Sequence, residues 1–347
     1  MGLIQIKKHF QAKPNMTSLK RSFSLRQSPS KRALLITLLP FVIAAVAFGL
    51  RLYSLDWDQG NLYHPDERSI FMRVDCMYKT LVDDPGWLAC ANRDFPLDQP
   101  GLPSVSTFFS AETSPLNPHW FPLGSILLYL LLIIRLTIGL LTDHVTLQDL
   151  AAAGRLVTVL IDTASVLLLY ALGKRLYSRR VGLLASAFGA FSFISIQLSH
   201  FYRPEPFIVL FILSSFWFML NVVKRRRWRD HLILGALIGL TFATRATSLH
   251  LLLPLSITYG LLIFNTWHEN RETVPIVSIL GVAVRGALAG MVALTCFAFW
   301  MPYAFIDIHK FLSDLFWEAG VAREAGLVPY TMQYIGTSSG IYELRQT

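Results

Sequence analysis

Charged residues are scarce in this chain. Asp, Glu, Lys and Arg make up 15% of its 347 residues, while 53% are hydrophobic. Average soluble proteins carry roughly 25% charged residues. Several apolar runs also exceed the roughly 18 residues that suggest a helix crossing a bilayer. The composition therefore excludes an ordinary soluble domain and predicts an all-α, polytopic helical membrane protein, with the lipid bilayer as its surroundings.

The sequence also lacks the motifs of several common classes. It has no Gly-rich phosphate loop, no zinc-type spacing of Cys and His, and no internal repeat. The net charge of +9 could suggest nucleic acid, but Lys and Arg cluster in short loops between apolar runs, and no nucleic-acid motif accompanies them. We interpret the basic loops as topology signals and expect no nucleic-acid partner.

Cysteine is nearly absent, with three residues in the whole chain. Cys296 lies in an apolar run, so we expect it to pack against other helices. Cys76 and Cys90 share a loop that we expect outside the cytosol, where a disulfide can persist. Their spacing alone does not establish one, because the separation of the two Cα atoms decides it.

The apolar runs predict the order of the helices. The sixth run is too long for one helix, so we expect two helices with a break at residues 245–248. The basic segment 1–32 ahead of the first run is predicted to be a disordered cytosolic tail, and residues 64–81 could form an amphipathic surface helix. The runs lie near residues 33–53, 122–141, 154–173, 181–198, 206–223, 231–265 and 278–300.

The positive-inside rule then decides the topology. The basic tail places the N-terminus in the cytoplasm. If residues 122–141 crossed the membrane, the basic loops 174–180 and 224–229 would both fall outside. We therefore predict that 122–141 lies at the outer interface or re-enters it. Residues 33–300 then form a transmembrane module, in which the first outer loop covers 54–153.

With this topology the costly polar residues gather at the extracytoplasmic face. Asp66 and Glu67 follow the first helix, and neighbouring carboxylates at a lipid interface resist ionisation, which can raise a pKa toward that of a working base. The alternative is a helix N-cap, or an ion pair with Arg68 or Arg73. We favour a catalytic role, in which Asp66 takes a proton and Glu67 orients it or shares the proton.

Other residues on this face could bind substrate. Glu205 could complete a divalent-metal site with Asp66 or bind a sugar or acceptor, with Arg203 and His200 beside it; its alternative role is to cap the helix that follows. Arg245 could bind a lipid phosphate through two parallel N–H donors of its guanidinium. Alternatively, its side chain could only extend to the membrane interface. Three residues near the end of the chain could line a substrate groove: Tyr330, Gln333 and Tyr334.

At this point the order of the motifs resembles the GT-C superfamily of membrane glycosyltransferases, and within it the phospholipid-carrier-dependent group of protein O-mannosyltransferases and aminoarabinose transferases. One departure is Arg203-Pro204-Glu205, where relatives often carry an Asp. The motifs that carry the resemblance are His64-Pro65-Asp66-Glu67, Trp120-Phe121-Pro122-Leu123-Gly124, Gly154-Arg155, Ser199-His200-Phe201-Tyr202, and Tyr330 with Gln333-Tyr334 and Gly336-Thr337.

The resemblance implies a GT-C-like fold and an inverting transfer of a hexose or pentose from a polyprenyl-phosphate-linked sugar to a protein, lipid or glycan acceptor. In that family the Asp of the first loop acts as the base. Residues 301–347 would begin an extracytoplasmic segment, and we expect a longer protein. The alternative functions are a lipid transporter or flippase and a non-catalytic membrane scaffold. A transporter should carry ionisable groups near the bilayer midplane in inverted repeats, which the sequence does not show.

Overall fold

The computed structural model describes residues 31–82, 105–142, 144–269 and 275–337, and in these ranges every regular element is a helix. The chain divides into two compact units, residues 1–39 and 40–347. The boundary falls at Pro40 inside helix α1 (Lys31–Leu52). Of the first unit only the start of α1 is described, so the predicted tail 1–32 lies almost entirely outside the described residues. All contacts discussed below belong to the second unit.

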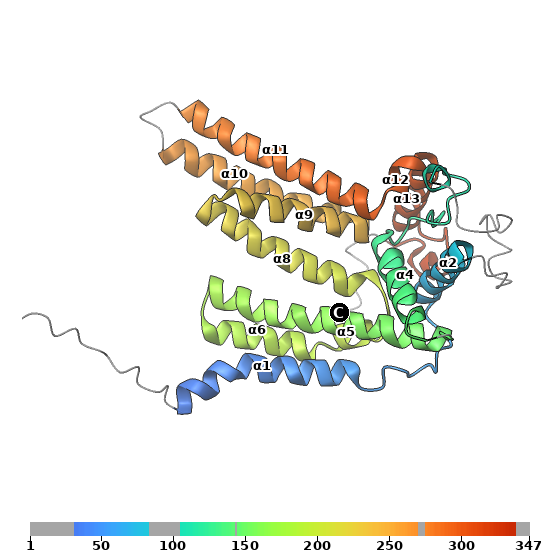
Figure 1. Ribbon diagram of the computed structural model, residues 1–347. Helices are drawn as coiled ribbons and strands as arrows, with labels where there is room; N and C mark the ends of the chain where they lie inside the picture. The colour runs from blue at the N-terminus through green and yellow to red at the C-terminus, as the bar shows by residue number, and fades with distance from the viewer. Residues whose placement is uncertain (1–30, 83–104, 143, 270–274, 338–347) are drawn as a thin grey trace, which may run out of the picture. The chain divides into compact units, whose positions relative to one another are not determined.

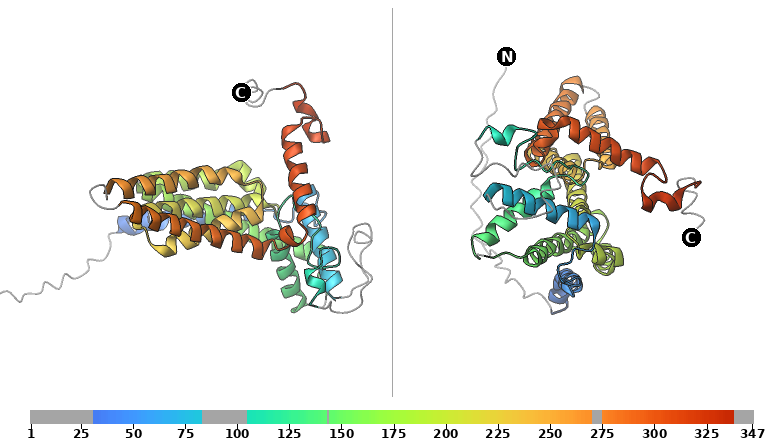
Figure 2. Two further views of the ribbon diagram at one scale, coloured as in Figure 1. Left: turned by 90° about the horizontal axis from the view of Figure 1, so that it is seen from above. Right: turned by 90° about the vertical axis from the view of Figure 1, so that its right-hand side faces the viewer.

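The long helices of the second unit lie side by side as an antiparallel bundle (Figures 1 and 2). Four segments are long and apolar enough to cross a membrane, and the pair α6–α7, bent by 55°, would add a fifth. The all-α polytopic prediction is thus confirmed. The helices are α5 (Leu147–Leu176), α6 (Arg179–Phe191), α7 (Phe193–Ser199), α8 (Pro204–Arg225), α9 (Trp228–Thr244), α10 (Leu252–Glu269) and α11 (Pro275–Trp300), with the 3-10 turn η2 (Leu249–Leu251) ahead of α10.

The sixth apolar run is broken as predicted, because α9 ends at Thr244 and α10 begins at Leu252. Small residues let α9 pack closely on α11. A Cβ atom added to Gly235 would lie 2.2 Å from the carbonyl oxygen of Ala289, and one added to Gly239 would lie 2.4 Å from that of Ala293. The small-residue spacing of α9 is therefore a helix-packing feature.

The shorter helices gather at one end of this bundle and run across it (Figures 1 and 2). Helix α4 covers 14 residues, or about 21 Å, which is shorter than the hydrocarbon core of a bilayer. It is accordingly not among the candidate spans, which supports the prediction that residues 122–141 do not cross. These elements are α2 (Pro65–Val82), α4 (Ile126–Gly139), α12 (Tyr303–Ile306), α13 (Ile308–Arg323) and the 3-10 turns η1 (Thr107–Phe109) and η3 (Pro329–Tyr334).

Helix α2 confirms the predicted amphipathic helix. Its apolar face is fully buried and packs on residues of α4, among them Leu127 and Leu131. The buried residues of α2 recur at helical spacing, as Ile70, Phe71, Val74 and Met77. Cys76 on the same helix is buried and disulfide-bonded, whereas Cys90 lies outside the described residues. Cys296 is a free thiol on α11.

The two basic loops lie at the end of the bundle opposite α2 and α4 (Figure 1). They form the α5–α6 and α8–α9 turns. The first turn of α2 and the starts of α8 and α10 lie at the other end. The fold therefore separates the basic loops from the acidic pair, as the topology prediction requires.

A buried ion pair ties α1 to this bundle. Arg51 is fully buried and its Nε donates to Asp162 of α5 at 2.5 Å. The same guanidinium donates to the carbonyl oxygens of Ala47, Gly189 and Ala190. A charge in such a place is costly unless it is paired.

Asp162→Asn should therefore be strongly destabilising, because it leaves the Arg51 cation buried without a counter-charge. We expect the free energy of unfolding, measured by denaturing-detergent titration, to fall by about 3–5 kcal/mol. The double variant Arg51→Met with Asp162→Leu should recover most of this loss. A single variant as stable as the wild-type protein would show that the pair does not hold α1.

Candidate active site

Asp66 and Glu67 lie in the first turn of α2 but face different surroundings. Successive residues on a helix point about 100° apart. Glu67 is fully buried, while the side chain of Asp66 is 39% exposed. The acidic pair is therefore divided between an interior group and a group that a substrate can reach.

The buried carboxylate of Glu67 is bound by Arg155 of α5, which is itself almost completely buried. Its Nε and Nη2 donate to Glu67, both at 2.8 Å, and its Nη1 and Nη2 donate to Asp58 at 2.8 and 2.7 Å. The hydrogen bonds from Arg155 lower the pKa of Asp58 below its usual value. One cation thus joins the loop after α1, the start of α2 and the N-terminal part of α5.

Glu67 also fixes the loop between α7 and α8. Its Oε1 accepts a hydrogen bond from the backbone N–H of Tyr202 at 2.9 Å, and the buried Tyr202 hydroxyl donates to the carbonyl oxygen of Leu127. Gly154 makes room for this packing, because a Cβ there would meet Phe71 and Tyr202 at 3.2 Å. The residue that follows Tyr202, Arg203, is thereby held beside α2.

Arg203 connects the accessible carboxylates. Its Nη2 donates to Asp66 at 3.0 Å and to Glu205 at 2.9 Å, and its Nη1 donates to Nε2 of His64 at 2.9 Å. An imidazole nitrogen that accepts a hydrogen bond carries no proton, and burial together with the Arg203 charge lowers the pKa of His64. One oxygen of Glu205, Oε2, is buried and has no hydrogen-bond partner among the described residues.

Arg245, at the end of α9, adds a second cation beside Glu205. It caps the C-terminus of α9, and its Nη1 lies 3.5 Å from Glu205 Oε1. The end of α9 packs tightly on Gly124, whose φ is +74° and whose added Cβ would meet the Ala243 carbonyl oxygen at 2.2 Å. Arg245 therefore faces the other charges. We call Asp66, Arg203, Glu205 and Arg245 the charge cluster.

A further carboxylate, Glu318 of α13, was missed by sequence reasoning. Burial raises its pKa; the charge of Arg245 opposes that rise, while the charges of Asp66 and Asp314 add to it. One turn earlier, Asp314 accepts from the backbone N–H of Phe121 at 2.9 Å, which anchors α13. The spacing of Asp314 and Glu318 places both on one helix face. This spacing is the feature of the sequence from which Glu318 could have been identified.

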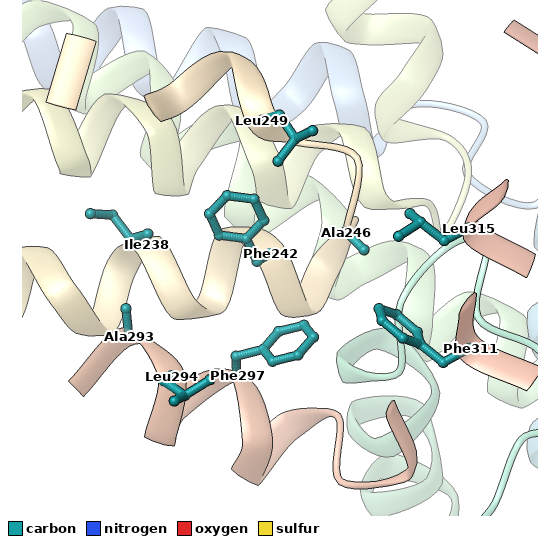
Figure 3. A pocket seen from close by; sticks show the side chains of 9 residues that line it. All are labelled: Ile238, Phe242, Ala246, Leu249, Ala293, Leu294, Phe297, Phe311 and Leu315. Atoms are coloured by element: carbon teal, nitrogen blue, oxygen red, sulfur yellow. The ribbon is translucent and has the colours of Figure 1, made fainter. Parts of the chain in front are cut away.

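An apolar cavity of about 330 Å³ begins beside the charge cluster. Its wall comes from α9, α11 and α13, and Ala246, the residue after Arg245, stands near the last of these helices (Figure 3). The rings of Phe242, Phe297 and Phe311 line it. The arrangement suits a ligand with an anionic end at Arg245 and a hydrocarbon end in the cavity.

His200 was expected among the substrate-binding residues, but it is not in the charge cluster. Its ring nitrogens lie 2.7 and 2.8 Å from the carbonyl oxygens of Ile196 and Tyr53. It lines a second apolar cavity of about 550 Å³, together with Trp57 and Phe193. Gln333 and Tyr334 have exposed side chains on η3, and the side chain of Tyr330 lies outside the described part of the chain.

The pair Asp66 and Glu205 does not fit a divalent metal. The Nη2 atom of Arg203 lies within 3.0 Å of both carboxylates, so a cation would have to displace it against charge repulsion. The described ranges also contain no group of three His, Cys, Asp or Glu side chains that could hold a metal ion.

Comparison with known proteins concerns the segment that carries most of this geometry. No curated protein sequence matches the chain. Residues 131–303 match the family model of dolichyl-phosphate-mannose-protein mannosyltransferases. Arg155, Arg203, Glu205 and Arg245 fall within this match, whereas Asp66 and Glu67 precede it. Residues 131–303 are therefore similar to a family of membrane glycosyltransferases that take their sugar from a polyprenyl-phosphate carrier.

Proposed function

We propose that the charge cluster transfers a sugar from a polyprenyl-phosphate carrier to an acceptor, with inversion at the anomeric carbon. The observation that carries this proposal is the position of Arg245. Its Nη1 lies 3.5 Å from Glu205 Oε1, and the next residue, Ala246, lines the apolar cavity. Arg203 joins Glu205 to Asp66, so a lipid phosphate at Arg245 would lie in the same charge cluster as the proposed base.

The donor is held at its two ends. The first isoprene units occupy the cavity between α9, α11 and α13, which is lined almost wholly by apolar side chains. Arg245 binds the phosphate, since a guanidinium offers two parallel donors to phosphate oxygens. Its charge stabilises the negative charge that grows on the leaving oxygen, and in a site of low dielectric this can contribute several kcal/mol.

Asp66 acts as the general base. Its carboxylate lies 3.0 Å from Arg203 Nη2 and its side chain is 39% exposed, so an acceptor can reach it. The acceptor hydroxyl or amine gives its proton to Asp66 while its oxygen or nitrogen forms a bond to the anomeric carbon. The bond between that carbon and the phosphate oxygen breaks on the opposite side, and its electron pair leaves with the phosphate.

Glu67 and Glu205 have different parts in this scheme. Glu67 is a positioning residue, because its carboxylate is bound by Arg155 and the Tyr202 backbone. Of the two roles considered from the sequence, orienting Asp66 and sharing its proton, these contacts support the first. Glu205 holds the two arginines of the charge cluster, because its Oε1 lies 2.9 Å from Arg203 Nη2 and 3.5 Å from Arg245 Nη1.

The positive-inside rule supports an extracytoplasmic reaction with a cytoplasmic N-terminus, since both basic loops lie at the far end of the bundle. The description of the matched family makes mannose the first donor and a protein the first acceptor to examine.

The roles of the two neighbouring carboxylates can be separated. In membranes that contain the full-length protein, Asp66→Asn should lower sugar transfer by about 10²–10⁴-fold, because the amide cannot accept the proton. The folded protein should keep its thermal stability. Glu67→Gln should instead lower the melting temperature, since it leaves Arg155 undercompensated. Normal turnover by Asp66→Asn would end its assignment as the base.

Arg245 should bind the carrier in the ground state. Arg245→Ala should weaken binding of a polyprenyl phosphate and slow transfer together, while Arg245→Lys should retain part of both because it keeps the charge. The matched control is Arg180→Ala, an exposed arginine at the start of α6. If correctly folded Arg245→Ala binds the carrier as tightly as the control does, Arg245 is only an interfacial anchor.

A further inference from the structure

A second arginine-lined cavity lies at the other end of the bundle, away from the charge cluster. Its volume is about 470 Å³, within the range of small-molecule sites. It is formed where the α8–α9 turn meets the end of α10 and the start of α11, a region far from α2 in Figure 1. Arg226 and Arg285 line it, with the hydroxyl-bearing residues Thr266 and Ser278.

Arg226 is fixed in place by the turn and by one carboxylate. Its φ of +52° places it in the left-handed region at the C-terminus of α8. Its Nη1 and Nη2 donate to the two oxygens of Glu269 at 2.6 and 2.8 Å. This bidentate pair uses the charge of Glu269 and leaves further N–H groups of Arg226 for another acceptor.

Arg285 lies about 15 Å along α11 from its first residue, inside a candidate membrane span. Its Nη1 donates to the carbonyl oxygen of Arg226 at 3.1 Å, and its guanidinium lies 5.2 Å from the centre of the Trp228 ring. Neither contact neutralises its charge, and in the described part of the chain no ion pair includes it. An arginine within an apolar helix usually faces a counter-charge.

The surrounding charge is strongly positive. Among the described residues of these segments, the carboxylates are Glu269, which is paired, and the buried Asp230, whose Oδ1 accepts from the Asn221 amide at 3.3 Å. The same described segments carry six cations, namely Lys224, Arg225, Arg226, Arg227, Arg229 and Arg285. A cavity with two positioned guanidinium groups in such a field is suited to an anion.

The apolar border of the cavity favours a lipid as the source of that anion. Val277 lines the cavity and is 68% exposed, and Leu280 and Val284 continue the same exposed stripe along α11. Phe264 on α10 is exposed as well. A free anion would leave this apolar surface uncovered, whereas the acyl chains of a lipid would cover it.

We propose that this cavity binds the phosphate headgroup of an anionic phospholipid, with Arg285 and Arg226 as the cationic ligands and the exposed faces of α10 and α11 as the surface for its acyl chains. The site is distinct from the charge cluster and does not depend on the proposed sugar transfer. Basic pockets between helices at a membrane surface are known to suit such headgroups.

The structure offers a steric test with a matched control. Gly281 lines the cavity, and a Cβ added there would meet no atom within 4 Å. Gly281→Leu should therefore fill the cavity and leave both arginines in place. Gly290 on the same helix has equally open surroundings and does not line the cavity, so Gly290→Leu controls for the added side chain. Arg285→Gln removes the charge.

The measurement is native mass spectrometry of the delipidated, folded protein titrated with phosphatidylglycerol or phosphatidylcholine. Wild type and Gly290→Leu should retain phosphatidylglycerol preferentially. Gly281→Leu and Arg285→Gln should bind it roughly five- to tenfold more weakly. Melting temperatures verify that each variant is folded. Unchanged binding by Gly281→Leu, or equal retention of the two lipids by wild type, would overturn the proposal. So would stabilisation by inorganic phosphate equal to that by phosphatidylglycerol, which would indicate a site for a free anion.

Discussion

The buried guanidinium of Arg155 is the contact on which the geometry of the candidate site depends. It joins Glu67 and Asp58 through four hydrogen bonds of 2.7 to 2.8 Å. Because Glu67 also binds the backbone of Tyr202, this one cation fixes the start of α2 against α5 and against the loop that leads to Arg203. Asp66, one residue before Glu67, is thereby held at the surface of the helix with its carboxylate beside Arg203. Removing one member of such a group leaves the others uncompensated.

The long-helix bundle separates two kinds of charge at its two ends. At one end carboxylates and arginines alternate in the charge cluster, and an apolar cavity begins beside Arg245. At the other end cations dominate, and the cavity beside Arg285 has no described carboxylate to neutralise that residue. The first arrangement suits a reaction in which charge moves from an acceptor to a leaving phosphate. The second suits the stable binding of an anion at the membrane surface.

Apolar periodicity was sufficient to predict the helices and the break before α10, because these features depend on local composition. The positive-inside rule adds the prediction that 122–141 does not span. The partners of individual side chains could not be predicted. Nothing in the sequence near Arg155 indicates that Glu67 and Asp58 meet it, since the three lie on separate elements. The burial of Glu67 beside the exposed Asp66 likewise depends on how α2 is rotated against α4. Glu318 was missed because it lies on an amphipathic helix whose docking only tertiary structure reveals.

The central claim is that the carrier lipid occupies the cavity beside Arg245, and photo-crosslinking tests it most directly. A polyprenyl phosphate with a diazirine on its first isoprene unit would be bound to the full-length protein, irradiated and mapped by peptide mass spectrometry. The account predicts crosslinks at Phe242, Phe297 or Phe311, which excess unlabelled carrier abolishes. Crosslinks confined to the second cavity, at Tyr53, Trp57 or Phe193, would contradict it.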